Sequence, residues 1–323
     1  MILGIATPYD ATAVALVGPD GEVVAESAAA QWHVHARYGG VVPRLAGDEH
    51  RANILPAVRT VIDRAGADPR TLTAIGVARG PGLIGSLRIG LDTAAALGLG
   101  WQVPVFGVNQ LRGRVRSAEL GRPSIRYPAL ILLVSGGQTL LAHMPSIGEI
   151  AVIGQTRDDA IGDAYEKVAR RLGLGYPGGP AVDRAAQSGS ANVPLPRPLL
   201  NKGFDFSFSG LKSAVMRQLH SSPEDLCASF VAACTEVLSA KTRRALRAYP
   251  AESLVVVGGV AASPQLRAAA RELSADAGIE LCLPPRRWCT TNAAMTAMTT
   301  WDYLAHDIQP LPVPSPRLSI ASW

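Results

Sequence analysis

The stretch at residues 158–183, DDAIGDAYEKVARRLGLGYPGGPAVD, joins a helix signal to a glycine turn, and the rest of the chain is organised around it. Its opening acids, Asp158 and Asp159, predict a helix N-terminus that those side chains cap. Apolar residues then recur at three- and four-residue spacing, which indicates a helix with one buried face. The turn at residues 176–180, YPGGP, would leave backbone N–H groups open to a flat ligand. An ordinary surface helix followed by a Pro/Gly loop would give the same pattern.

The composition places the chain among globular proteins. Its 323 residues can bury a large core and are enough for two domains, and no apolar run is long enough to cross a bilayer. The first residues, MILGIATPYD, predict a strand rather than a signal peptide, and four cysteines in so long a chain are not a disulfide framework. We therefore expect a cytoplasmic protein without membrane contact. The net charge of +5 permits binding to nucleic acid or nucleotides but does not establish it.

The first part of the chain predicts three strands within residues 2–29, with an Asp-Gly hairpin signal, and then a helix at residues 43–65. Asp10 falls in the turn between the first two strands, where a phosphate or its metal could be met. His33 and His35 could ligate a metal, although a lone pair of histidines at this spacing is more often incidental.

A glycine loop follows the next strand. The buried strand at residues 72–78 runs into RGPGLIGS at residues 79–86, and a helix is expected from there to residue 97. A strand, a glycine loop and a helix N-terminus in that order form an anion cradle in principle, although this one lacks a Walker lysine. A further strand at residues 103–108 ends at the segment NQLRGR, residues 109–114.

The pattern of strands and alternating helices then restarts, which predicts two similar α/β lobes with a cleft between them. The proline-rich tail after Ile308 is expected to be loose. The second part predicts strands at residues 129–135, 147–155, 254–259 and 279–285, helices at 158–172, 222–249 and 292–306, and an irregular insert at 187–208. Four glycine turns lie at or near element ends, where they would line the cleft and suit a phosphate-bearing ligand. They are residues 80–85, 135–137, 178–179 and 258–259.

Several blocks of the chain, highly specific when taken together, carry a resemblance that extends nearly from end to end. They are HARYGGVVPRLA at 35–46, RGPGLIGSLRIGL at 79–91, LVSGG at 133–137, AYEKVARRLGLGYPGGPAVD at 164–183, DFSFSGLKSAV at 205–215, GGVAAS at 258–263 and CTTNAAM at 289–295. On these blocks the chain resembles the TsaD family. That family has the α/β fold of actin, Hsp-seventy and the sugar kinases (the ASKHA fold), with two RNase-H-like lobes around a nucleotide cleft.

The resemblance implies two lobes. An N-terminal lobe at residues 1–118 would be closed by a C-terminal helix at 292–307, and a C-terminal lobe at 119–291 would carry an insert at 187–215. Family members transfer a threonylcarbamoyl group from an AMP mixed anhydride to an adenosine in tRNA. Related carbamoyltransferases of antibiotic pathways use similar domains on small hydroxyl compounds. The family's older name, O-sialoglycoprotein endopeptidase, finds no support, because no nucleophile–histidine pair or metalloprotease helix is legible.

The resemblance also implies that an adenine nucleotide or acyl-AMP binds to residues that lie mostly in the glycine turns. They are Leu133, Val134, Ser135, Gly136, Gly137, Glu166, Gly179, Asp183, Gly258, Gly259 and Ser263. Glu166 stands where the family usually has Asp. Its longer side chain would still accept hydrogen bonds from a ribose.

The family's metal-ligand pattern is not retained. In the family, two histidines of an N-H-x-x-G-H pattern and the aspartate of a C-T-D-N pattern hold the metal. This chain has Gln110, Arg114 and Thr291 at those positions. A guanidinium stays protonated and has no lone pair to offer, so we expect no metal at the family site.

The replaced residues conserve the charge of the site. Two neutral histidines, one aspartate and a divalent cation sum to about +1, and Gln110, Arg114 and Thr291 also sum to about +1. An arginine can clamp a phosphate or carboxylate and so supply the electrostatic role of the metal without its Lewis acidity. Arg112 would add a second positive group if it faces inward. Alternatively, both arginines face solvent on a short helix.

Two main hypotheses follow. The first is a metal-independent, TsaD-like acyltransferase in which Asp10, Ser135 and Arg114 lie nearest the reacting phosphate, Lys212 makes a lid contact, and the acceptor is no longer necessarily tRNA. The second is a catalytically inactive paralogue that binds nucleotide and pairs with itself or with a TsaB-like protein through the N-terminal lobe. A third reading, ordinary metal-dependent tRNA threonylcarbamoylation, conflicts with the missing ligands.

Overall fold

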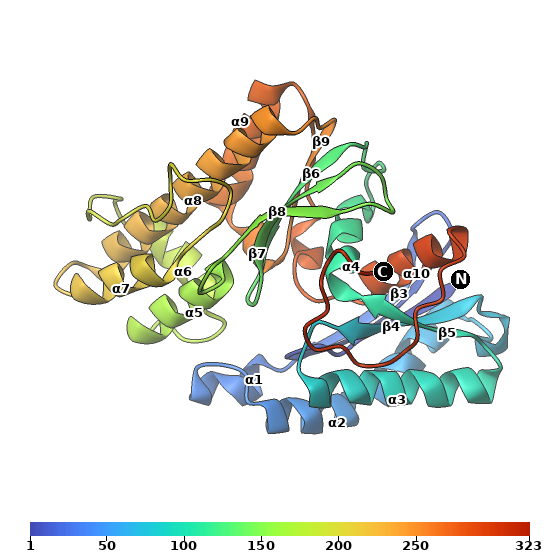
Figure 1. The fold of residues 1–323 in the computed structure, drawn as a ribbon. Helices are drawn as coiled ribbons and strands as arrows, with labels where there is room; N and C mark the ends of the chain where they lie inside the picture. Colours follow the sequence, from blue (N-terminus) through green and yellow to red (C-terminus); the bar gives the residue numbers. More distant parts are fainter. The chain divides into compact units, whose positions relative to one another are not determined.

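The computed structural model describes residues 1–323 and divides the chain into two compact units. Unit 1 comprises Met1–Pro123 and Thr290–Trp323, and unit 2 comprises Ser124–Cys289. Each unit contains one five-stranded sheet with helices packed on it (Figure 1). No helix is both long enough and apolar enough to span a membrane.

The sheet of unit 1 has the order β3-β2-β1-β4-β5. Its strands are β1 (Ile2–Ala6), β2 (Ala11–Val17), β3 (Val23–Ala30), β4 (Ala74–Gly80) and β5 (Val105–Asn109). The first three strands form the predicted antiparallel meander, while β4 and β5 run parallel to β1. The parallel pairing brings the carboxyl ends of β1, β4 and β5 to one edge of the sheet, where the candidate residues of this unit follow.

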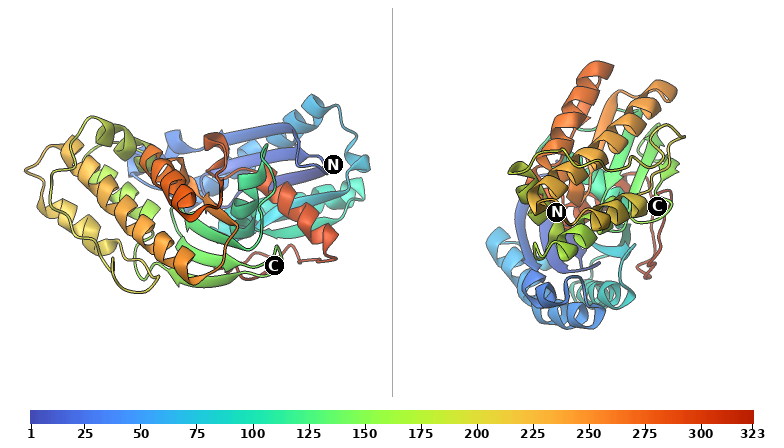
Figure 2. Two further views of the ribbon diagram at one scale, coloured as in Figure 1. Left: turned by 90° about the horizontal axis from the view of Figure 1, so that it is seen from above. Right: turned by 90° about the vertical axis from the view of Figure 1, so that its left-hand side faces the viewer.

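Helices cover both faces of this sheet. The helices of the unit are α1 (Trp32–His35), α2 (Pro43–Ala65), α3 (Ile84–Trp101), α4 (Gln110–Arg116) and α10 (Ala294–Ala305). Helices α2 and α3 lie together on one face, and α10 packs with α4 on the other (Figures 1 and 2). Helix α10 approaches the strands closely because a Cβ atom at Gly4 or Gly76 would collide with it. The predicted helix at 43–65 is confirmed, and α3 begins earlier than its periodicity suggested.

Unit 2 repeats the arrangement with the strand order β10-β9-β6-β7-β8. Its strands are β6 (Ala129–Val134), β7 (Thr139–Met144), β8 (Ala151–Gln155), β9 (Ser253–Val257) and β10 (Glu280–Cys282), and its helices are α5 (Ile161–Arg171), α6 (Gly178–Gln187), α7 (Ser209–Arg217), α8 (Pro223–Ala248) and α9 (Pro264–Ala277). The long helix α8 begins as predicted, where the Ser222 hydroxyl accepts a hydrogen bond from the Asp225 N–H. Short 3₁₀ turns complete the two units at Ala36–Tyr38, Pro69–Thr71, Ser117–Glu119, Gly259–Ala262 and Arg286–Trp288.

The acidic pair that opens the 158–183 stretch does not cap helix α5, so that prediction is wrong. The N-cap is Ala160, which makes no side-chain capping bond. The Asp158 carboxylate instead accepts hydrogen bonds from the Ser207 and Ser209 hydroxyls at 2.6 and 2.7 Å. Charge pairing and hydroxyl donors from a distant segment thus override the local capping preference of these side chains.

The proline-rich tail is docked on unit 1, so the expectation of a loose tail is also wrong. The Gly107 N–H donates to the Pro310 carbonyl at 3.0 Å, and the Ser315 N–H donates to the Arg79 carbonyl at 2.7 Å. The tail therefore follows β4 and β5, where Figure 1 shows it in dark red. Glycine at position 107 permits this approach, because a Cβ there would collide with the tail backbone.

Candidate functional site

The first candidate segment in unit 2 is the turn between β6 and β7. The Ser135 N–H donates to the Gln138 carbonyl at 2.8 Å, which closes the turn around Gly136 and Gly137. The Ser135 carbonyl accepts from the Gly162 N–H at 3.2 Å, and glycine is needed at 162 because a Cβ there would lie 2.6 Å from that oxygen. The start of α5 is therefore held directly against the Ser135 turn.

Helix α5 is also joined to the N-terminus of α6. Both carboxylate oxygens of Glu166 accept from the Gly178 N–H at 2.9 Å, and one lies 3.4 Å from the Gly179 N–H. The carboxylate neutralises the positive end of the α6 helix. Glu166, expected to serve a ribose, is thus engaged with the backbone of the glycine turn in this structure.

Three candidate glycines of unit 2 face open space, as do Gly173, Gly175, Gly203, Gly210 and Gly278 of the same unit. A Cβ atom added at Gly136, Gly179 or Gly259 would meet no atom within 4 Å. Gly258 differs, because its φ is +101° and a Cβ there would collide with the Val134 carbonyl. The packing of the protein itself therefore requires glycine at 258, but not at the other three positions, where a ligand could approach the backbone.

Asp183 is the titratable group of this region. Its carboxylate accepts a hydrogen bond from the Ser263 hydroxyl at 3.0 Å, which links α6 to the start of α9. Burial raises the pKa of the Asp183 carboxyl to about 6, although the Ser263 hydrogen bond and the positive charge of Arg286 oppose that rise. Because the charge of this half-buried carboxylate is poorly solvated, hydrogen bonds from the hydroxyl groups of a sugar would stabilise it.

These contacts bring the candidate residues of unit 2 into one connected region. Leu133 and Val134 are fully buried, so only their backbone atoms could serve a ligand. Gly258 packs on Val134, the Ser135 turn contacts α5, α5 holds α6, and α6 reaches Ser263. The arrangement offers open backbone at three turns and one carboxylate.

Lys212, suggested as a lid contact, lies at the edge of the same unit in an ion-pair cluster. Its ammonium pairs with the Asp159 carboxylate at 2.8 Å, and Lys167 pairs with the other oxygen of that carboxylate at 2.5 Å. These pairs and the Asp158 hydrogen bonds tie α7 to the start of α5. No spacing rule predicts this cluster, because Lys212 lies 53 residues from Asp159 in the sequence and Lys167 lies 8 residues from it.

In unit 1 the candidate segment is α4, which follows β5. The Asn109 side chain caps this helix by accepting from the Leu111 N–H at 3.0 Å. Gln110 is buried, and its amide Nε2 lies 3.5 Å from the Thr291 hydroxyl, while its Oε1 has no partner within the protein. Two of the three family metal positions thus lie side by side, and one buried acceptor between the elements is unsatisfied.

The two arginines of α4 have different surroundings. Arg112 is buried in the tail, since its Nε donates to the carbonyls of Ile320 and Ser322 at 3.1 and 2.9 Å and its guanidinium lies 3.9 Å from the Trp323 ring centre. The Arg112 side chain therefore holds the tail on unit 1. Arg114 is 8% exposed on the same helix and does not face solvent as a free surface group.

The residues at the family's metal positions do not fit a metal ion. They supply one amide, one guanidinium and one hydroxyl, and the guanidinium has no lone pair. No group of three or more His, Cys, Asp or Glu side chains in residues 1–323 is placed to hold a metal ion. His33 and His35 do not converge either, because His33 is exposed and His35 is fully buried.

Asp10 lies where it was expected, in the turn between β1 and β2. Two backbone donors of the glycine loop at residues 80–85, whose pattern predicted an anion cradle, are bonded within the protein. The Gly82 N–H donates to the tail carbonyl of Pro316 at 3.2 Å, and the Leu83 N–H donates to the Pro8 carbonyl at 2.9 Å. The loop donors are used within the protein, and its glycines allow the tail and the Asp10 turn to pack closely.

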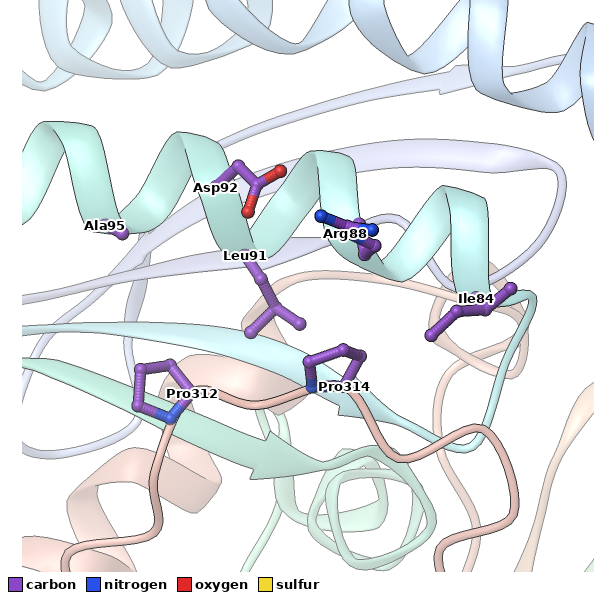
Figure 3. A pocket seen from close by; sticks show the side chains of 7 residues that line it. All are labelled: Ile84, Arg88, Leu91, Asp92, Ala95, Pro312 and Pro314. Atoms are coloured by element: carbon purple, nitrogen blue, oxygen red, sulfur yellow. The ribbon is translucent and has the colours of Figure 1, made fainter.

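A separate cavity of about 370 Å³ lies between α3 and the tail (Figure 3). Leu91 points towards Pro312 and Pro314, and the Arg88 and Asp92 side chains stand along the helix above them. None of these residues was a candidate from the sequence. The cavity is therefore distinct from both groups of candidate residues.

Comparison with solved structures defines the class of protein. The chain resembles component A of (R)-2-hydroxyglutaryl-CoA dehydratase from Acidaminococcus fermentans, with a TM-score of 0.55 at 16% identity over 94% of this chain and 98% of that one. It also resembles HypF of T. kodakarensis, with a TM-score of 0.63 at 13% identity over 97% of this chain and 48% of that one. These similarities establish the ASKHA fold, as predicted, and nothing about activity.

Sequence comparison then gives the family. The family profile "TsaD: tRNA N6-adenosine threonylcarbamoyltransferase" matches residues 22–298. The chain is 44% identical over 306 residues to the tRNA N6-adenosine threonylcarbamoyltransferase of Bacillus subtilis, covering 92% of this chain and 88% of that protein. It is also 44% identical over 319 residues to the protein of that name from Trichlorobacter lovleyi, covering 96% and 93%. The chain belongs to the TsaD family.

Proposed function

We propose that this chain transfers a threonylcarbamoyl-type acyl group from an acyl-adenylate to an adenosine of tRNA. The observation that carries this proposal is the family match over residues 22–298, with curated relatives of 44% identity that are named for this reaction. The open glycines and Asp183 in unit 2 support an adenylate as the donor. The identity of the relatives favours tRNA over the small hydroxyl acceptor considered from the sequence alone.

The reaction requires an amine of the acceptor to attack the carbamoyl carbon. The new C–N bond forms, the C–O bond to the phosphate of AMP breaks, and the amine loses a proton. In this proposal, the backbone of the Ser135 turn and Gly179 lies against the nucleotide, and Asp183 accepts from its ribose. Asp10 is the candidate acceptor for the departing proton.

We also propose that transfer proceeds without the family's metal, with Arg114 contacting the phosphate or the carboxylate of the donor. The chemistry of Gln110, Arg114 and Thr291 supports this, because it offers positive charge and hydrogen bonds rather than metal ligands. The unsatisfied Oε1 of Gln110 adds a buried acceptor beside Thr291, which a donor group of the ligand could satisfy.

A protein partner is proposed on the outer face of α2 and α3. Three large apolar side chains of these helices are exposed: Leu55 of α2 at 58%, and Ile84 and Leu99 near opposite ends of α3 at 51% and 84%. A second copy of the chain or a TsaB-like protein would cover such an apolar face. Light scattering of the chain, alone and with a TsaB-like protein from the same genome, distinguishes these partners, and Leu99→Glu should weaken whichever complex forms.

The function is tested by label transfer. The chain is mixed with labelled threonylcarbamoyl-adenylate, tRNA and its partner in chelated buffer, and the tRNA is digested to nucleosides. Labelled adenosine is the expected product. If the chain binds the adenylate but transfers the label neither to tRNA nor to small hydroxyl acceptors, it is instead an inactive, nucleotide-binding paralogue.

A further inference from the structure

A directed chain of hydrogen bonds crosses unit 1 from the start of α2 to the Asp10 turn. The Val42 N–H donates to His35 Nδ1 at 3.3 Å, and His35 Nε2 lies 3.2 Å from Gln31 Oε1. The Gln31 amide nitrogen lies 3.2 Å from His50 Nδ1, and His50 Nε2 lies 3.0 Å from the Tyr9 carbonyl. Both imidazoles are fully buried.

The backbone groups at the two ends of this hydrogen-bond chain determine which ring nitrogens between them carry a proton. A backbone N–H can only donate, so His35 Nδ1 must be unprotonated, and a backbone carbonyl can only accept, so His50 Nε2 must carry the proton. His35 then donates from Nε2 to the Gln31 carbonyl, and the Gln31 amide donates to His50 Nδ1. Both histidines are therefore neutral Nε2–H tautomers, and a flip of the Gln31 amide would place donors against donors.

The surroundings agree with neutral imidazoles. The Thr12 hydroxyl also donates to His50 Nδ1, at 2.8 Å. Burial lowers the pKa of both His35 and His50, although the negative charges of Asp10 and Glu49 act in the opposite direction. A proton on His35 Nδ1 would face the Val42 N–H, and a proton on His50 Nδ1 would face the Gln31 amide donor, which leaves the Thr12 hydroxyl oxygen to accept from it.

The hydrogen-bond chain ends at the turn of residues 8–10, whose three backbone carbonyls all accept hydrogen bonds. The Pro8 carbonyl accepts from the Leu83 N–H at 2.9 Å, and the Asp10 carbonyl accepts from the Gln31 N–H at 2.9 Å. The Tyr9 carbonyl between them accepts from His50. Three consecutive carbonyls are thus bonded to the start of α3, to α2 and to the start of α1, which fixes the backbone from which the Asp10 side chain projects.

We propose that His50, His35 and Gln31 are positioning residues that act through Asp10, holding its turn with a relay of neutral Nε2–H imidazoles. The inference rests on the proposed function, because the role of Asp10 in acyl transfer belongs to that proposal. It assigns the two buried histidines of this unit neither to a metal nor to proton transfer. Their hydrogen bonds hold the backbone of the Asp10 turn in place.

The tautomers are tested directly by NMR. Long-range ¹H–¹⁵N correlation spectra of histidine-labelled protein should show two Nε2–H imidazoles between pH 6 and 8, assigned with the His35→Asn and His50→Asn variants. A charged imidazole or an Nδ1–H tautomer at His50 would overturn the relay, whatever the protein's activity.

Two isosteres of His50 separate its two hydrogen bonds. The amide of Asn occupies the place of Nδ1, and the amide nitrogen of Gln reaches the place of Nε2. His50→Asn should therefore lose the Tyr9 contact and lower the transfer rate by about 10- to 100-fold, the usual cost of a small misplacement. His50→Gln should retain most of the rate, and His33→Asn, an exposed neighbour of the relay, should retain all of it. Affinity for an AMP analogue should remain unchanged in all three variants.

A double-mutant cycle separates positioning from general damage. If the relay acts through Asp10, His50→Asn should cost nothing further in an Asp10→Ala background. Equal losses in both backgrounds would overturn the inference, as would wild-type transfer by His50→Asn. If the wild-type chain itself transfers nothing, the proposed function fails, and the tautomer spectra still decide whether the relay exists.

Discussion

The glycine loop at residues 80–85 in unit 1 and the glycine turns of unit 2 are alike in sequence and opposite in surroundings. A Cβ atom added at Gly82 would lie 2.7 Å from the Pro8 carbonyl oxygen, whereas one added at Gly136 or Gly179 would meet nothing within 4 Å. The first loop is glycine-rich because other parts of the chain pack on it. Packing requires glycine at Gly258 but not at Gly136, Gly179 or Gly259, and open glycines are the pattern expected where a ligand approaches the backbone.

The largest expected effect follows from filling that open space. Gly179→Arg should weaken binding of an AMP analogue by about 100-fold or more while leaving the melting temperature of the free protein nearly unchanged. Gly82→Ala should do the reverse, destabilising the fold by about 1–3 kcal/mol without changing nucleotide affinity. Isothermal titration and thermal unfolding of both variants measure the two effects. Gly85→Ala, with open space around it on α3, is the matched control.

If Gly179→Arg binds the nucleotide as well as the wild type does, the open turns of unit 2 are not the nucleotide site. A parallel loss of stability in Gly179→Arg would mean that its glycine, like Gly82, serves packing. Either result would remove the distinction between the two kinds of glycine loop.

A second contrast separates sites built from backbone and sites built from side chains. The proposed nucleotide pocket of unit 2 depends mainly on open turns, whereas the metal site that the family resemblance implies would depend on three side chains, at positions where this chain has Gln110, Arg114 and Thr291. Arg114→Ala should therefore weaken an acyl-adenylate analogue by about 10- to 150-fold, equivalent to roughly 1.5–3 kcal/mol for a charge-assisted contact. Arg114→Lys should recover part of the loss, because an ammonium keeps the charge and loses the planar fork.

The exposed Arg122 provides the control for charge, since Arg122→Ala removes the same group from the surface of the same unit. Calorimetric titrations of the three variants are compared at one ionic strength. Equal affinities for the wild type and Arg114→Ala would show that the arginine makes no contact with the ligand.

The smallest effect concerns Asp183, whose pKa in the folded protein is about 6. Because this value lies above the ordinary 3.8, the folded state binds a proton at a higher pH than the unfolded state does. The stability that the neutral form provides is fully present below about pH 4 and is lost as the pH rises through about 6. Asp183→Asn should therefore remove this part of the pH dependence and be more stable than the wild type at pH 7, as measured by urea unfolding across that range.

The pH curve of the wild type alone does not isolate Asp183, because burial also raises the pKa of Asp302 to about 6. The difference between wild type and Asp183→Asn cancels the contribution of Asp302. A difference that does not change between pH 4 and 7 would mean that Asp183 has an ordinary pKa.

Periodicity and turn signals were sufficient to predict most of the fold. They predicted the meander of β1–β3, the long helices α2 and α8 and two α/β lobes, whereas the ASKHA fold was implied by the resemblance to the TsaD family. Local rules failed where distant partners intervened. Asp158 pairs with the serines before α7 instead of capping α5, and the tail is held by Arg112 and by backbone hydrogen bonds that no periodicity encodes.

The candidate site was predicted as a set of residues but not as a set of contacts. Sequence motifs identified Ser135, Gly179 and Asp183, and the structure places them in one connected region of unit 2. They did not reveal that Glu166 bonds to the Gly178 N–H or that Arg112 is buried in the tail. Side-chain length and the position of a tail decide those contacts, and both depend on tertiary structure.

We propose that Gln110, Arg114 and Thr291, at the positions of the family's metal ligands, bind the donor without a metal. The most direct test is a calorimetric titration of a non-hydrolysable threonylcarbamoyl-adenylate analogue into the wild-type chain, before and after exhaustive chelation, with the iron and zinc content measured on the same samples. The account predicts substoichiometric metal and the same dissociation constant in both titrations. A stoichiometric metal whose removal weakens binding, and whose return restores it, would contradict the account.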